Sequence, residues 1–248
     1  MTKLQRYQHL GLLTSFIVLV LTGFALKYPD SLLGVAFINE AVRSYVHRVA
    51  GTLLVAVSIF HIYYVIRYKE GRKLIKDLLP DFKDATDIRD VLLYYTGFSK
   101  KRPEFLRFNY AEKMEYWALV WGTIVMAVTG LMAWFKVPVG NLVPRWTIDV
   151  GITIHFYEAI LATLAIIVWH FYMIIFDPDV YPMNWAWYDG KMTLEQYREE
   201  HGLDSQTILK AIQANAESQA QESAESNHGT EEPETIAAGA SGRTKTDQ

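Results

Sequence analysis

Residues 154–173 read IHFYEAILATLAIIVWHFYM, a continuous apolar run with one histidine near each end. In an α-helix, the 15 residues that separate His155 from His170 place the two imidazoles about 60° apart around the axis and about 22 Å apart along it. Both side chains therefore point to roughly one face at two depths. A polar imidazole is costly in hydrocarbon, so histidines in such a segment usually face a bundle interior and have a function there. The pattern predicts two stacked ligand sites.

Four apolar blocks of this kind occur in the chain, which has 248 residues, 51% of them hydrophobic. Each block runs for about 17 to 25 residues with almost no charge, the length that a helix needs to cross a ~30 Å hydrocarbon layer. We therefore expect an all-α, integral membrane four-helix bundle, with helices at about residues 10–26, 44–66, 116–135 and 152–176. The first block lacks a small-x-small cleavage site, so we expect it to remain in the mature protein.

The second block repeats the histidine pattern of the fourth. His47 and His61 are 14 residues apart, about 40° short of four helical turns and about 21 Å along the axis. One hairpin separates the two blocks, so the second and fourth helices run in the same direction. The histidines then match in depth, His47 with His155 and His61 with His170. His9, at the edge of the first block, reaches the same depth as His61.

Glycines share the helices that surround these histidines. Gly23 follows His9 by 14 residues and lies within about 40° of its azimuth. Gly11 is on the same helix, and Gly122 and Gly130 are on the third. Such small residues either admit a flat ligand or let helices pack closely, and spacing alone leaves both interpretations open.

The simplest explanation for two imidazoles opposite each other in a water-free bundle is that they bind a metal. Helix faces that carry glycine, together with abundant aromatic residues, favour haem over zinc or copper. Two histidines per iron leave no open position, so such a haem carries electrons and does not bind O₂. The chain has no cysteine, which excludes cysteine-ligated iron–sulfur clusters, CxxCH-type haem, disulfides and thiolate zinc sites. With a net charge of −3 and acidic residues gathered in the tail, nucleic acid is not an expected partner.

Glu158 follows His155 by three residues in the fourth block. As a buried acid it could orient an imidazole or relay protons. It could equally pair with an arginine near the outer interface: Arg43, Arg48 or Arg145. Both interpretations stay open at this point.

Lysine and arginine are concentrated between residues 67 and 113 and are few in the two opposite loops. By the positive-inside rule, the N-terminus, this basic loop and the C-terminus are cytoplasmic, and the chain spans the inner membrane in contact with lipid. Within the loop, residues 87–96 are amphipathic, as in a helix that lies along the membrane surface, and Pro80 and Pro103 interrupt the segment.

The chain divides into a membrane domain at residues 1–200 and a cytoplasmic tail at residues 201–248. Thr193 is expected to begin a short helix. The tail is poor in large apolar residues, so we expect it to be mostly disordered beyond a short helix near residues 207–216. His201 and His228 lie outside the bilayer and are given no ligand role.

Three sets of motifs stand out: QRYQHLGLL…LTGFALKYP in the first helix, FNYAEKMEYW leading into VTGLMAWF in the third, and IHFYEAILA…WHFYM in the fourth. Through them, over nearly all of residues 5–200, the sequence resembles the membrane cytochrome b subunit of respiratory formate dehydrogenases and, more broadly, the hydrogenase-type cytochrome b family. The resemblance implies two non-covalent b-type haems and a quinone site near the cytoplasmic haem. It also implies partner subunits that hold the catalytic or electron-accepting centres, such as an iron–sulfur or multihaem cytochrome c protein.

The resemblance pairs His47 with His155 on the outer haem and His9 with His170 on the inner one. His61 departs from that family and has the spacing found in the cytochrome b of bc-type complexes, where the second and fourth helices supply all four ligands. Only one of His9 and His61 can share His170 on a six-coordinate iron. We expect His9 to be that ligand and keep His61 as the alternative. The histidine left over would serve quinone binding, proton transfer or a further haem.

These observations predict a membrane-anchoring electron-transfer subunit of a quinone-linked oxidoreductase, which carries electrons between a quinone pool and a redox partner and is not catalytic alone. One alternative is a stand-alone quinone oxidoreductase of the same helical design. Another is a proton or metal transporter, which would need a polar pathway. The predicted helices are almost wholly apolar apart from the histidines and Glu158, and the chain has no soluble catalytic domain, so the subunit is the favoured prediction.

Overall fold

The computed structural model describes residues 1–36, 39–101, 103–178 and 180–228, and these residues form helices and connecting loops without a strand. The elements in chain order are α1 (Lys3–Lys27), α2 (Leu32–Ala36), α3 (Glu40–Arg67), α4 (Lys69–Leu78), α5 (Phe82–Tyr95), α6 (Tyr110–Trp134), α7 (Lys136–Gly140), α8 (Arg145–Leu164), the π-helical η1 (Ala165–His170) and η2 (Tyr172–Phe176), the 3₁₀-helix η3 (Trp185–Trp187), α9 (Leu194–Glu200) and α10 (Gly202–His228).

Four helices are long and apolar enough to cross a membrane: Lys3–Lys27, Glu40–Arg67, Tyr110–Trp134 and Arg145–Phe176. They confirm the predicted all-α bundle and its four spans. All four spans begin earlier than their apolar blocks, and polar residues cap three of them. The side chains of Thr2, Asn39 and Asn109 each accept a backbone N–H of the first turn of their helix, which satisfies donors that would otherwise lack partners.

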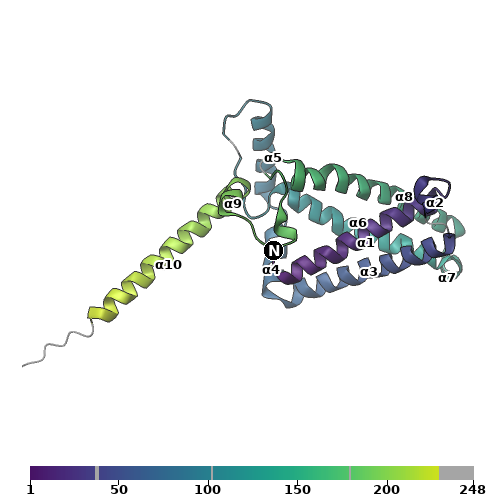
Figure 1. The fold of residues 1–248 in the computed structure, drawn as a ribbon, viewed down its shortest axis with the longest axis horizontal. Coiled ribbons are helices and arrows are strands. Elements are labelled where there is room, and N and C mark those ends of the chain that lie inside the picture. The colour runs from purple at the N-terminus through teal and green to yellow at the C-terminus, as the bar shows by residue number, and fades with distance from the viewer. Residues whose placement is uncertain (37–38, 102, 179, 229–248) are drawn as a thin grey trace, which may run out of the picture. The chain divides into compact units, whose positions relative to one another are not determined.

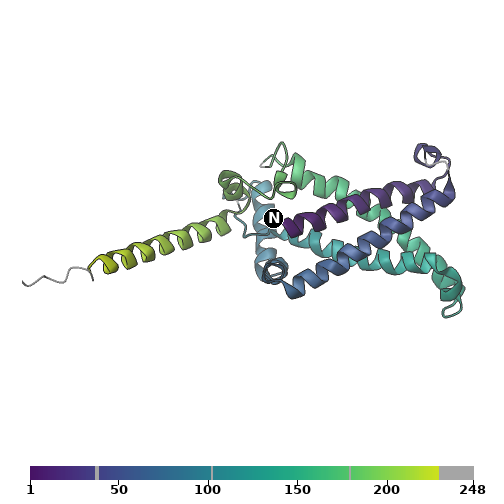
Figure 2. The ribbon, with the colours of Figure 1, turned by 60° about the horizontal axis from the view of Figure 1, so that its bottom comes forward.

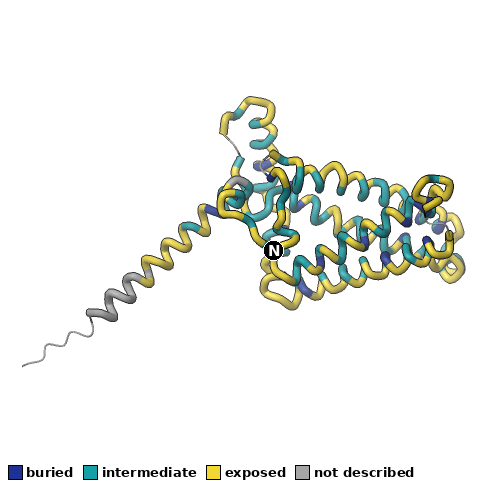
Figure 3. Tube along the Cα trace, viewed as in Figure 1, coloured by how far each residue is buried: buried dark blue, intermediate teal, exposed yellow. Residues whose placement is uncertain are grey.

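The spans associate as two pairs, α1 with α3 and α6 with α8 (Figure 1). Several of the buried residues within the first pair are small, among them Ser15, Ala25 and Ala50, so the backbones can approach closely at these positions. Many large apolar residues of the spans are instead exposed, and exposed positions recur along the spans in Figure 3. A continuous apolar exterior of this kind is the surface of a protein solvated by lipid.

The fourth span changes its winding near one end. From Ala165 to His170 and again from Tyr172 to Phe176 the helix is π-helical. A π turn takes about one residue more than an α turn, so it rotates the following side chains back around the axis. His170 therefore does not keep the azimuth that a regular helix would give it relative to His155.

Short helices cover the end of the bundle where α1 begins, while α2 and α7 close the other end (Figures 1 and 2). Trp117 of α6 donates its ring N–H to the carbonyl of Leu78 in α4 at 2.9 Å, and Lys113 pairs with Asp84 of α5 at 2.8 Å. The helix α5, longer than the predicted 87–96 segment, runs across the bundle axis (Figure 1). Its position on a membrane surface stays a prediction.

Towards the C-terminus, Thr193 caps α9 by accepting the N–H of Gln196 at 3.2 Å, as expected. The chain forms one compact unit over Met1–Asp204 and a second over Ser205–Gln248. In the second unit, α10 reaches His228, well beyond the predicted 207–216 helix, because its Ala, Gln and Glu residues are strong helix formers. The disorder predicted for residues 229–248 lies outside the described residues.

Candidate functional site

His47 of α3 and His155 of α8 face each other across the two helix pairs. Their ring centroids are 6.3 Å apart, with the ring planes at 70°. One imidazole comes from each pair of helices, so the contact bridges the α1–α3 pair and the α6–α8 pair. This is the juxtaposition that the equal depths of the two histidines predicted.

A threonine hydroxyl supports each of these imidazoles. Thr22 Oγ1 lies 2.9 Å from His47 Nδ1, and Thr129 Oγ1 lies 3.0 Å from His155 Nδ1. Each threonine already donates its own proton to the carbonyl four residues earlier, at 2.6 and 2.7 Å. The hydroxyl oxygens must therefore accept from the Nδ1–H groups, which leaves the lone pair of each Nε2 free for a metal.

A glycine follows each of these threonines and lies against the same imidazole. A Cβ atom at Gly23 would come 3.3 Å from Cε1 of His47, and one at Gly130 would come 3.2 Å from Cε1 of His155. Both contacts are tighter than an ordinary side chain makes. Glycine is thus the residue that lets the backbone pass beside each ring.

The second pair, His9 of α1 and His170 at the end of η1, is built differently. The ring centroids are 6.4 Å apart and the ring planes are tilted by 37°. Glu115 of α6 brings a carboxylate oxygen to 2.5 Å from His170 Nδ1. Neither Nδ1 of this pair makes a hydrogen bond of regular geometry with the described residues. The ring centroids of His9 and Trp187 are 6.4 Å apart.

Both pairs have the separation that one shared metal requires. An imidazole nitrogen binds a metal at about 2 Å and lies about 1.2 Å from its ring centre, so two imidazoles on opposite sides of one ion have centroids about 6.4 Å apart. The measured values are 6.3 and 6.4 Å. Within the described part of the chain, no group of three or more His, Asp or Glu side chains could hold a metal ion. A zinc site would need more protein ligands, whereas haem needs only two.

His61 is not placed opposite His170. Its Nδ1 lies 2.7 Å from Oε1 of Gln8, and its Nε2 lies 3.1 Å from the hydroxyl of Tyr116. Both ring nitrogens are therefore engaged by polar side chains. In this arrangement His61 neighbours the His9–His170 pair through Gln8 and is not part of it.

The remaining predicted site residues have packing contacts. A Cβ at Gly11 would lie 3.0 Å from Cγ2 of Val57, so this glycine lets α1 approach α3. A Cβ at Gly122 would lie 2.9 Å from Oε1 of Glu158, so Gly122 makes room for that carboxylate. Of the arginines considered for Glu158, Arg43 donates to the carbonyl of Gly34 at 2.6 Å.

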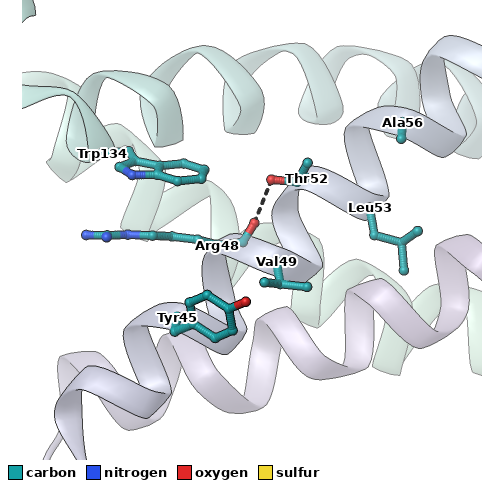
Figure 4. Close-up of a pocket in the computed structure, with 7 residues that line it drawn as sticks. All are labelled: Tyr45, Arg48, Val49, Thr52, Leu53, Ala56 and Trp134. Atoms are coloured by element: carbon teal, nitrogen blue, oxygen red, sulfur yellow. Dashed lines mark hydrogen bonds between the residues drawn. The ribbon is translucent and has the colours of Figure 1, made fainter.

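A groove of about 450 Å³ lies on the outer side of α3, between Tyr45 and Trp134 (Figure 4). The guanidinium of Arg48 stacks over the ring of Trp134 at 5.3 Å, and Thr52 donates to the carbonyl of Arg48 at 2.8 Å. No histidine lines this groove, so it is separate from both imidazole pairs.

Two pairs of opposed imidazoles between membrane-spanning helices define the class of the molecule, a membrane cytochrome b. A family model described as prokaryotic cytochrome b561 matches residues 1–182, and the chain belongs to this family. A comparison with curated proteins found no match. The family confirms the predicted resemblance, and with it haem of the b type, electron transport and a location in the membrane.

Proposed function

We propose that the chain holds two b-type haems, one between His47 and His155 and the other between His9 and His170. The observation that carries this proposal is the pair of nearly equal centroid distances, 6.3 and 6.4 Å, which match two imidazoles on one iron. The contacts of His61 with Gln8 and Tyr116 favour His9 over His61 as the fourth ligand.

When bound, haem supplies a reversible one-electron centre, and the protein decides how it is held. Thr22 and Thr129 fix the tautomers of His47 and His155, so that each Nε2 keeps its lone pair for a metal. The carboxylate of Glu115, 2.5 Å from Nδ1 of His170, restrains that ring. Gly23 and Gly130 keep the adjacent helix faces flat. With two protein ligands at each site, such a haem would carry electrons and would leave no position for O₂.

We propose further that the chain carries electrons between a quinone pool and a partner redox subunit, an iron–sulfur or multihaem cytochrome c protein. The concentration of lysine and arginine between residues 67 and 113 supports cytoplasmic termini in the inner membrane. The His9–His170 pair then lies on the cytoplasmic side, where the quinone site is expected, and the partner receives or supplies electrons on the His47–His155 side.

Pyridine haemochrome analysis of the purified chain tests the haem proposal. We expect about two non-covalent haems per polypeptide and low-spin spectra of bis-imidazole type. Folded protein that carries one haem or none would contradict it.

A reporter fused after Gln248 tests the orientation in the membrane. The reporter should be active only if it is of a kind that works in the cytoplasm. Activity of a reporter that works only after export would show the opposite orientation.

Purification from native membrane in mild detergent tests the partner proposal. A subunit should be recovered together with other redox subunits, and the isolated chain should not turn over quinone against an external acceptor at a comparable rate. Full turnover by the isolated chain would instead support the stand-alone oxidoreductase.

A further inference from the structure

His61 is the one histidine of the membrane spans that the two proposed haems leave unassigned, and it lies in a polar cluster contributed by three helices. Gln8 of α1 and Tyr116 of α6 contact its two ring nitrogens at 2.7 and 3.1 Å. Tyr64 stands one turn further along α3, with its ring centroid 6.3 Å from that of His61. The cluster of Gln8, His61, Tyr64 and Tyr116 thus joins the α1–α3 pair to α6.

Two polar atoms of this cluster are buried without a hydrogen-bond partner among the described residues. They are Nε2 of Gln8 and the hydroxyl of Tyr64, and their side chains are only 6% and 2% exposed. A buried polar group without a partner destabilises the fold. Both atoms are hydrogen-bond donors, so what they lack is an acceptor.

We propose that the cluster of Gln8, His61, Tyr64 and Tyr116 binds the carbonyl end of a quinone headgroup. This inference rests on the proposed quinone-linked function and assigns its site to particular residues. A quinone carbonyl oxygen only accepts hydrogen bonds and has two lone pairs, which suits the unpartnered donors of Gln8 and Tyr64. The flat ring suits a site bordered by two tyrosine rings.

The location of the cluster fits both electron transfer and access from the membrane. Gln8 directly precedes His9 in α1, so a headgroup bound there lies beside the His9–His170 pair. The neighbours of His61 on α3 face outward: Phe60, Ile62 and Tyr63 are 40%, 60% and 52% exposed on the apolar surface of the bundle. An apolar quinone tail can therefore remain in lipid while its headgroup reaches the cluster.

The reaction of a quinone needs protons as well as electrons. Reduction of a quinone to a quinol takes two electrons and two protons, and oxidation releases them. The electrons pass singly through the cytochrome. Both ring nitrogens of His61 are engaged, by Gln8 and by Tyr116, so His61 holds these two side chains in place, and both protons are exchanged with the aqueous phase.

Binding of a short-tailed benzoquinone and a short-tailed naphthoquinone to the oxidised, haem-loaded full chain, followed by calorimetry, tests the proposal. His61→Phe should weaken the tighter of the two by at least about tenfold. Tyr64→Phe, which removes only a hydroxyl, should weaken it by about threefold or more. Ser58→Ala is the matched control on α3, because Ser58 donates to the carbonyl of Leu54 in its own helix at 2.8 Å. The quinone affinity of this variant should equal that of the wild type.

Haem content separates this inference from the proposed function. Both variants should keep two haems and the wild-type spectrum after reduction by dithionite. If wild-type affinity persists in both variants, the buried donors serve a water molecule and the quinone site is wrong, while the haem proposal stands. Loss of a haem from His61→Phe would also overturn the inference, because His61 would then be a ligand. A wild-type chain without haem would instead refute the proposed function itself.

Discussion

The two ends of the bundle hold an imidazole pair at the same separation but build it in different ways. At the His47–His155 end, each ring has a threonine on its Nδ1 and a glycine at its edge. At the His9–His170 end, a carboxylate oxygen of Glu115 lies 2.5 Å from Nδ1 of His170, and neither Nδ1 makes a hydrogen bond of regular geometry with the described residues. At the first end, the same threonine–glycine arrangement occurs in both helix pairs. At the second end, residues from different segments of the chain surround the two rings.

This difference has an electronic consequence for the proposed haems. A neutral hydroxyl holds an imidazole without adding charge, whereas Glu115 places a carboxylate oxygen 2.5 Å from the ring of His170. A nearby negative charge stabilises ferric iron over ferrous iron. By this cause alone, Glu115 lowers the midpoint potential at the His9–His170 end relative to the hydroxyl-supported end.

Removal of single ligands should give the largest effect. His47→Ala is expected to reduce the haem count from two to one, and His9→Ala should do the same at the opposite end, because the two sites share no ligand. His61→Ala should keep both haems. Pyridine haemochrome analysis measures each count. A His61→Ala protein with one haem, alongside a His9→Ala protein with two, would show that α3 and α8 supply all four ligands.

The glycine beside each hydroxyl-supported ring should matter almost as much. In Gly23→Val, a side chain must occupy the space 3.3 Å from Cε1 of His47, so we expect most of the haem at that end to be lost and the other haem to remain. Gly51→Val is the matched control in the same helix pair, because a Cβ there meets its nearest atom, in Leu19, at 3.8 Å. Equal haem loss in both variants would point to helix packing as the role of Gly23.

The spans and the His47–His155 pair could be predicted from sequence because they depend on local periodicity. Apolar length defines the helices, and equally deep histidines in parallel helices meet where both face the bundle interior, as His47 and His155 do. The supporting threonines were missed, although the dipeptide Thr-Gly at 22–23 and 129–130 was a readable sign of them. The two Thr-Gly dipeptides thus become two equivalent supports, one for His47 and one for His155.

The His9–His170 end was less predictable, because non-local contacts build it. Glu115 and Trp187 reach the pair from α6 and η3, and no spacing within one helix indicates this. The π-helical winding before His170 also breaks the regular 100° step on which azimuth arguments depend. Gln8 and Tyr116 around His61 were missed for the same reason.

Glu115, the carboxylate at the His9–His170 end, allows a third test of the difference between the two ends, by measurement of redox potentials. Glu115→Gln keeps the shape of the side chain and removes its charge, so the midpoint potential of the haem at the His9–His170 end should rise. A change of about 1.4 kcal/mol in relative stability corresponds to about 60 mV for one electron. Thr129→Val should shift the other haem less, because a hydroxyl carries no charge. A redox titration followed optically measures both, and a larger shift in Thr129→Val would contradict the assignment.

The smallest expected effect concerns residues 194–204, near the His9–His170 end of the bundle. Low pH should weaken the contact that His201 makes there with Leu106. His201 is 5% exposed, and its Nδ1–H donates to the carbonyl of Leu106 at 3.0 Å. Burial lowers the pKa of His201, and the hydrogen bond to Leu106 only partly offsets this. The unfolded segment therefore binds a proton more readily than the folded one, and stability falls as pH drops below about 6.5 towards the folded pKa.

Hydrogen exchange of residues 194–204, corrected for the intrinsic pH dependence, should accordingly be faster at pH 5.5 than at pH 7.5. His201→Gln keeps a donor but cannot take up the proton, so its protection should be nearly independent of pH over this range. Tyr197→Phe removes the hydrogen bond from Tyr197 to Asp204 and should lower protection at both pH values, with the pH dependence retained. If His201→Gln keeps the wild-type pH dependence, another group titrates.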